Sequence, residues 1–112
     1  MQMCEPTTEP GLLSSTAVFP ALKAHAEEIK AQHLRDLMGD EARCASLLAE
    51  HNGITMDVSR QKVTPDTMSL LTTLFEQQEV AKKLAAVQAG EEMNPTEGRS
   101  VLHTALRSSP DQ

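Results

Sequence analysis

The sequence predicts a mostly α-helical chain with one short strand. Apolar residues recur at steps of three and four over most of residues 19–89, which is the period of a helix with one buried face. Strict alternation of apolar and polar residues occurs in one stretch, residues 54–59. A length of 112 residues allows at most one small domain.

The predicted order begins with a disordered lead-in over residues 1–16, which contains Pro6, Pro10 and Gly11 among several Ser and Thr residues. Residues 17–107 form one helical segment, and its first helix starts near Pro20. Residues at helical spacing place one face of it inward: Phe19, Leu22, Ala26, Ile29, His33 and Leu37.

Gly39 and Asp40 interrupt this pattern, and Asp40 is placed to cap a second helix. That helix is expected to run to about Glu50, with an inner face of Cys44, Leu47 and Leu48. Residues 51–53 are predicted to end it, because Gly53 can adopt a positive φ at no steric cost.

A strand follows over residues 54–59, where Ile54, Met56 and Val58 alternate with polar residues. A single strand has no partner for its ladder hydrogen bonds, and unpaired buried backbone groups are costly. We therefore expect it either to pair with sequence outside this chain or to fray, which suggests an incomplete fold.

Residues 64–66 predict a further helix start. Thr64 can cap, Pro65 has a suitable φ for the first helical position, and Asp66 complements the helix dipole. The apolar residues of this helix form one inner stripe: Met68, Leu71, Leu74 and Phe75. A following helix, which ends at Gly90, carries a second stripe: Val80, Leu84 and Val87. A last short helix is predicted within residues 99–107.

Composition narrows the classes of function. The net charge of −6 argues against nucleic-acid binding, which needs clustered Lys and Arg. No apolar run is long enough to span a membrane, and the acidic N-terminal residues fit neither a signal peptide nor a transit peptide. Cys4 and Cys44 are expected to be free thiols. Aromatic residues are limited to Phe19 and Phe75, so a stand-alone core would be thin.

The sequence carries no strong catalytic or metal-binding pattern. The four histidines, His25, His33, His51 and His103, lack the spacing of a metal site. The isolated glycines form no phosphate loop, and there is no GxSxG elbow. Cys44 could form a Cys–His nucleophile, but its place on an apolar helical face favours a buried structural thiol.

The charged residues near the C-terminus allow two interpretations. On a helix, Arg99, His103 and Arg107 would share one face, with Glu97 in the first turn. They could form a basic stripe that faces an anion or a catalytic cleft. They could instead form an ion-paired network that anchors this segment to a larger protein. We favour the second interpretation, because repeatedly charged stripes are usually solvated or paired.

Residues 94–107 read Asn-Pro-Thr-Glu-Gly-Arg-Ser-Val-Leu-His-Thr-Ala-Leu-Arg. This segment resembles the glucose-6-phosphate isomerase family, which has Asn-x-Thr/Ser-Glu-x-Arg-Ala/Ser-Val-Leu-His-x-Ala-Leu-Arg near its N-terminus. Residues 33–38, 43–44, 56–61, 66–68 and 89–91 also resemble that family, most closely its plant cytosolic form. The resemblance covers roughly residues 22–107, and residues 108–112 leave the family pattern.

The resemblance implies a cytoplasmic enzyme of glycolysis and gluconeogenesis that interconverts glucose 6-phosphate and fructose 6-phosphate without a metal or organic cofactor. A hexose phosphate is the substrate of the full-length enzyme only, which is expected to be a homodimer and to bind neither nucleic acid nor membrane. The family fold is α/β with two sugar-isomerase (SIS-type) domains, and this chain resembles the helical lead-in that packs against them.

No position here matches the family's catalytic or phosphate-binding motifs, so no catalytic, substrate-binding or metal-binding residue is assigned. The family-motif residues are expected to be structural: Asn94, Thr96, Glu97, Arg99, His103 and Arg107. Two hypotheses follow. The chain is an N-terminal isomerase fragment that is inactive alone, or it is a helical binding module that docks onto isomerase subunits.

Overall fold

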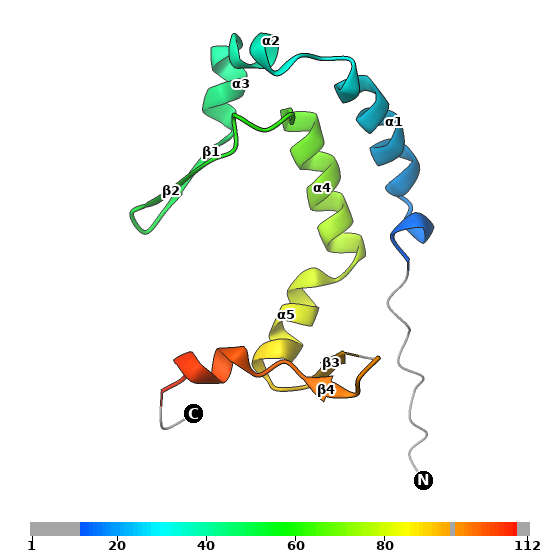
Figure 1. Cartoon of the computed structure of the whole chain (residues 1–112), viewed down its shortest axis with the longest axis vertical. Coiled ribbons are helices and arrows are strands. Elements are labelled where there is room, and N and C mark those ends of the chain that lie inside the picture. The colour runs from blue at the N-terminus through cyan, green and yellow to red at the C-terminus, as the bar shows by residue number, and fades with distance from the viewer. Residues whose placement is uncertain (1–11, 95, 110–112) are drawn as a thin grey trace. The chain divides into compact units, whose positions relative to one another are not determined.

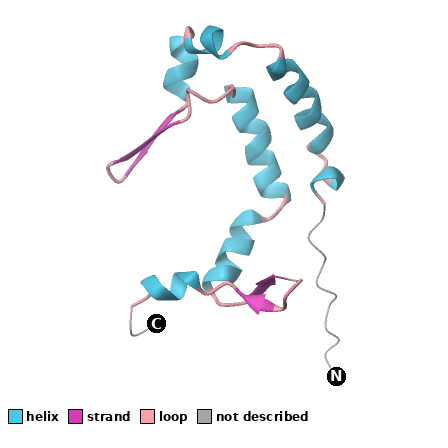
Figure 2. Ribbon diagram, in the orientation of Figure 1, coloured by secondary structure: helices cyan, strands magenta, loops and turns pink. Residues whose placement is uncertain are grey.

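A computed structural model describes residues 12–94 and 96–109. The chain is mostly helical with two small antiparallel strand pairs (Figures 1 and 2), so the prediction of a mostly α chain is confirmed and the prediction of one strand is wrong. It divides into two compact units, the first ending at Leu74 and the second beginning at Phe75.

The first unit starts with four helical elements, a 3-10 turn and three α-helices. A 3-10 turn, η1, occupies Leu13–Ser15, at the end of the expected disordered lead-in, whose residues 1–11 lie outside the described part of the chain. Helix α1 spans Phe19–Lys30, and Pro20 lies in its first turn. Helices α2 and α3 span Leu34–Met38 and Glu41–Ser46.

Two side chains set where α2 and α3 begin. Asp40 Oδ1 accepts a hydrogen bond from the Arg43 N–H at 2.9 Å, so the predicted cap is confirmed. His33 is extended, and its Nδ1 accepts from the Arg35 N–H at 3.1 Å. The first predicted helix therefore ends at Lys30 rather than running on to Leu37, because the imidazole of His33 satisfies an N–H at the start of a new helix.

The predicted second helix is wrong beyond Ser46. Strand β1, Leu48–His51, pairs antiparallel with β2, Ile54–Asp57, and His51 lies opposite Ile54. Asn52 and Gly53 connect them with φ of 49° and 77°, the left-handed pair that a two-residue hairpin turn requires. Residues 51–53, which were expected to end a helix, instead lie at the turn of a hairpin. The strand thus has its partner within this chain, and the argument for an incomplete fold from an unpaired strand is removed.

Helix α4 spans Pro65–Gln77, so it begins directly after Thr64, as predicted. The Thr67 N–H donates to Thr64 Oγ1 at 3.3 Å, and the Thr64 N–H donates to Thr67 Oγ1 at 2.9 Å. These reciprocal bonds satisfy two backbone donors, in the manner of a capping box.

The second unit contains α5, Val80–Gln88, followed by β3, Glu92–Asn94, and β4, Arg99–Ser100. The strands pair antiparallel, with Glu92 opposite Ser100. A 3-10 helix, η2, spans His103–Arg107. The short helix predicted within residues 99–107 is therefore found there as a 3-10 helix, while residues 99 and 100 are extended.

The apolar core is small. Val18, Leu37 and Leu47 are the buried apolar side chains among residues 12–94 and 96–109, and no side chain there is completely enclosed. Many large apolar side chains are exposed, including those of Ile54, Met56, Leu84 and Leu106. No helix in the described part of the chain is long and apolar enough to cross a membrane.

Candidate functional site

The most highly bonded side chain of the first unit is that of Arg43, which is only 5% exposed. Its Nε donates to Val63 O at 2.8 Å, and Nη1 donates to Leu37 O at 3.0 Å. Its Nη2 donates to Ser59 O at 3.0 Å and to Gln61 O at 2.8 Å. The guanidinium therefore joins α3 to α2 and to the loop that leads from β2 to α4.

The Arg43 site is structural rather than chemical. Four backbone carbonyl oxygens surround the cation, and no carboxylate forms an ion pair with it in the described residues. A buried charge needs compensating hydrogen bonds, and the fixed fork of guanidinium N–H groups can donate to several carbonyls at once. The sequence analysis did not predict that Arg43 would be buried. The signal for it was its position four residues, or about one helical turn, before the apolar Leu47, which is also buried.

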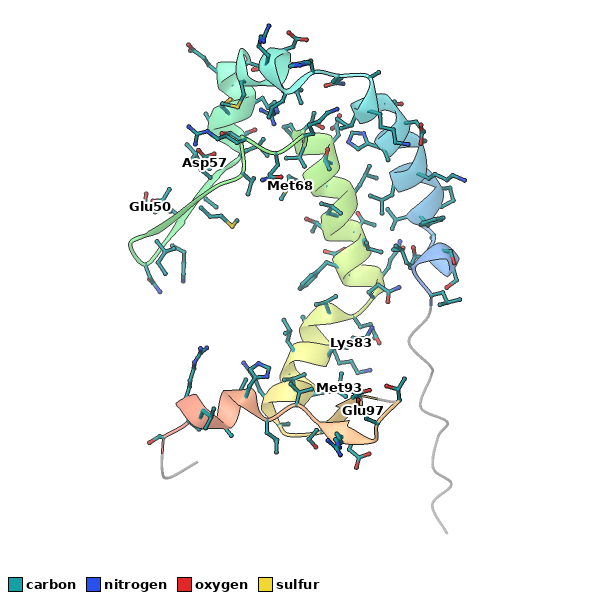
Figure 3. All side chains as sticks on the ribbon, in the orientation of Figure 1. Glu50, Asp57, Met68, Lys83, Met93 and Glu97 are labelled. Atoms are coloured by element: carbon teal, nitrogen blue, oxygen red, sulfur yellow. The ribbon has the colours of Figure 1, made fainter. Side chains whose placement is uncertain are left out.

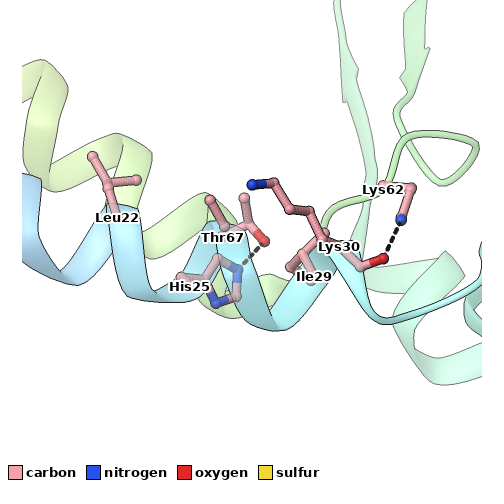
Figure 4. A pocket seen from close by; sticks show the side chains of 7 residues that line it. Leu22, His25, Ile29, Lys30, Lys62 and Thr67 are labelled. Carbon is pink, nitrogen blue, oxygen red and sulfur yellow. Dashed lines mark hydrogen bonds between the residues drawn. The ribbon is translucent and has the colours of Figure 1, made fainter.

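A cavity of about 340 Å³ lies between α1 and residues 62–67 of the same unit (Figure 4). At its polar end His25 Nε2 and Thr67 Oγ1 are 2.6 Å apart, and Lys62 Nζ donates to Lys30 O at 3.3 Å. Seven residues line it: Leu22, His25, Ala26, Ile29, Lys30, Lys62 and Thr67. This lining holds no carboxylate and no nucleophilic thiol beside the imidazole, so it lacks a paired acid and base.

The family-resembling segment begins with a tight turn in the second unit. Asn94 Oδ1 accepts from the Thr96 N–H at 3.1 Å and from the Thr96 hydroxyl at 2.6 Å. The Gly98 N–H donates to Asn94 O at 2.9 Å, and Gly98 has a φ of 59°. Asn94 and Thr96 therefore use their polar groups locally, to reverse the chain between β3 and β4.

The charged residues of the segment do not form the predicted helical stripe. Glu97 lies in the turn (Figure 3), Arg99 lies in β4, and His103 and Arg107 lie at opposite ends of η2. All four side chains are exposed and make no hydrogen bond or ion pair with the described residues. The prediction of one continuous helical face is wrong because Arg99 is in extended backbone.

The histidines and cysteines do not assemble a metal site in the described residues. His25 contacts Thr67, His33 caps α2, and His51 Nε2 lies 3.1 Å from Asn52 Nδ2. Cys44 is half-buried on α3, with its Sγ 3.8 Å from Met38 O, while Cys4 lies outside the described residues. Cys44 is thus less buried than predicted.

Comparison with known proteins gives one family and a set of close relatives. The family model described as phosphoglucose isomerase matches residues 57–112. A cytosolic glucose-6-phosphate isomerase of Oenothera sinuata var. hirsuta is 46% identical over 99 residues, covering 88% of this chain and 17% of the relative. The cytosolic enzyme of Arabidopsis thaliana is 44% identical over 100 residues, covering 89% of this chain. The chain spans 17% and 18% of the length of these two relatives.

Proposed function

The chain belongs to the phosphoglucose isomerase family, and on that premise we propose that it is an N-terminal segment of a glucose-6-phosphate isomerase. That enzyme interconverts glucose 6-phosphate and fructose 6-phosphate. The main support for this proposal is the 46% identity to the Oenothera cytosolic glucose-6-phosphate isomerase over 99 residues, which covers 88% of this chain. We propose that the family segment begins at residue 17, after the lead-in of residues 1–16. The match to the family model runs to residue 112, so residues 108–112, which the sequence pattern placed outside the family, lie within it.

We further propose that the chain alone has no isomerase activity and contributes structure to the enzyme. Moving a proton between neighbouring sugar carbons needs a general base within hydrogen-bond reach of the substrate. The first unit's polar residues support a structural role, because Arg43 bonds backbone carbonyls and His25 bonds a helix-capping threonine. Hexose phosphate would then bind residues that this chain does not supply.

The family-motif residues fit the same proposal. Asn94 and Thr96 shape a turn through their own hydrogen bonds. The side chains of Glu97, Arg99, His103 and Arg107 are exposed in the second unit and form no hydrogen bond or ion pair with residues 12–94 or 96–109. We propose that these four side chains pair with the rest of the isomerase and anchor the segment, rather than contacting the reacting sugar.

The names of the relatives support a cytosolic location, and we propose a role in glycolysis and gluconeogenesis. We propose that the complete enzyme works as a homodimer without a metal or organic cofactor and binds neither nucleic acid nor membrane. We also propose that this chain is the helical lead-in that packs against the SIS-type domains of the complete enzyme.

A coupled assay tests the proposed inactivity. Fructose 6-phosphate would be offered to the purified chain, and glucose 6-phosphate would be detected through its dehydrogenase. Arabidopsis cytosolic isomerase provides the positive control. We expect no turnover above the enzyme-free background. Turnover that persists after depletion of contaminating isomerase would refute the proposal.

The second candidate is a binding module that docks onto isomerase subunits. Its support is the number of large exposed apolar side chains, among them Ile54 at 73% and Leu106 at 91% exposure. Sedimentation of the chain mixed with intact Arabidopsis isomerase distinguishes the two. Co-sedimentation at a fixed ratio favours the module, whereas independent sedimentation favours a segment whose docking site is already occupied in the intact enzyme.

A further inference from the structure

The β1–β2 hairpin has two chemically different faces. Residues opposite one another in an antiparallel pair share a face, and successive residues alternate between faces. The uncharged face therefore consists of Ala49, His51, Ile54 and Met56. The acidic face consists of Leu48, Glu50, Thr55 and Asp57, two of which carry carboxylates (Figure 3).

Every residue of both strands is exposed. On the uncharged face, Ile54 is 73% and Met56 is 55% exposed, although both are large apolar side chains. Antiparallel strands that alternate in this way usually bury one face and hydrate the other. A hairpin of two strands is also only marginally stable in water on its own. The uncharged face thus has the composition of a buried surface and is exposed in this chain.

The relatives indicate what covers it. This chain spans 17% of the Oenothera enzyme, so most of the surface of such an isomerase lies outside the segment that this chain represents. A second copy of the chain is a weaker candidate. Two uncharged faces would bring four residues from each side, whereas a stable interface uses roughly 20–30 residues a side.

We propose that the uncharged face docks against the part of the isomerase polypeptide outside this segment, which buries Ile54 and Met56. The acidic face remains in solvent, where the Glu50 carboxylate is hydrated and Asp57 keeps the hydrogen bond that it accepts from the Ser59 N–H. This inference rests on the proposed function, because it takes its occupant from that enzyme.

Thiol accessibility tests the docking without adding a charge. In a hybrid protein, this chain replaces the matching segment of Arabidopsis cytosolic isomerase. One variant carries Ile54→Cys, and its matched control carries Thr55→Cys, the next residue of the same strand on the opposite face. Both are treated with N-ethylmaleimide in the hybrid and in the isolated chain, and each labelled site is identified by peptide mass.

Each thiol is compared with itself in the isolated chain and in the hybrid, because the carboxylates of Glu50 and Asp57 beside position 55 slow formation of the reactive thiolate there. In the hybrid, labelling of Ile54→Cys should slow by about tenfold or more, while Thr55→Cys should change by less than about threefold, because thiol reactivity follows exposure. Protection of Ile54→Cys that grows with the concentration of the isolated chain would make a second copy the occupant and overturn the proposal.

The remaining outcomes separate the docking from the proposed function. An active hybrid in which Ile54→Cys reacts as fast as in the isolated chain overturns the docking and leaves the proposed function standing. A folded but inactive hybrid that protects Ile54→Cys supports the docking and counts against the proposed function. A hybrid that does not fold overturns the docking, because the two surfaces then fail to fit.

Discussion

At the scale of single residues, Arg43 places a cation on the inner face of α3 and surrounds it with carbonyl oxygens instead of a carboxylate. Asp40 could be predicted as a cap, because its side chain needs only the N–H three residues ahead. The partners of Arg43 lie up to 20 residues away, at Val63. Periodicity carries no information about contacts at such a separation, so this part of the structure could not be predicted.

Removing the Arg43 guanidinium should loosen the loop before α4. Arg43→Met leaves four carbonyls without their donors, which should cost about 3 kcal/mol or more. Amide exchange of residues 58–64, followed by mass spectrometry, should become faster. Arg35→Met, at an exposed position of α2, is the control and should leave it unchanged. Equal exchange in both variants would show that the carbonyl contacts do not hold the loop.

Asp57 should give a measurable pH dependence at the end of β2. Hydrogen bonds from the Ser59 hydroxyl and N–H, the latter at 2.8 Å, lower the pKa of the Asp57 carboxyl below its ordinary 3.8. Because the folded pKa is the lower one, the stabilisation is complete above the unfolded pKa and is lost as the pH falls through the folded value. An NMR titration of the Asp57 carboxyl measures the shift. Ser59→Ala should raise the pKa toward 3.8, and no change would mean that the hydroxyl is not its cause.

At the scale of elements, the helices were predicted far better than the strands. Helices α1, α4 and α5 each carry several turns of apolar spacing, and α4 also has a capping signal at Thr64. Strand β1 is short, and its Leu48 continues the apolar spacing of α3, so local pattern favoured a longer helix. Residues 52–53 did not distinguish a helix end from a hairpin turn, since a glycine with positive φ is common in both.

Substituting Gly53 should weaken the hairpin through backbone strain alone. Gly53 has a φ of 77°, and a Cβ added there would meet no atom within 4 Å. Gly53→Ala should therefore cost about 1 kcal/mol, because an L-residue is disfavoured in this region. Amide exchange of residues 48–57 measures the loss.

The stereochemical control is D-alanine at position 53, introduced by chemical ligation at Cys44. D-alanine adopts positive φ without this strain and adds the same methyl group. If L- and D-alanine speed the exchange equally, the methyl group rather than the backbone conformation is responsible.

At the scale of the whole molecule, the resemblance carried by residues 94–107 predicted the family, which the comparisons then established. It did not predict how those residues are arranged, because a motif records residue types and not their hydrogen bonds. The side chains of Asn94 and Thr96 turned out to be satisfied locally, whereas those of Arg99, His103 and Arg107 make no hydrogen bond or ion pair within the described residues. Together with the small core, this arrangement supports our central proposal, that the chain is a structural segment of an isomerase and does not carry its catalytic residues.

The most direct test of that claim is Arg99→Ala in the hybrid isomerase, with Tm and kcat measured on the same preparation. If Arg99 pairs with the rest of the enzyme, its loss leaves a partnered charge unpaired, which costs about 3–5 kcal/mol when the pair is buried. We predict a clearly lower Tm and a kcat, measured below that Tm, within about threefold of the unsubstituted hybrid. A variant that melts like the unsubstituted hybrid but loses most of its kcat would contradict the account, because Arg99 would then act on the reaction itself.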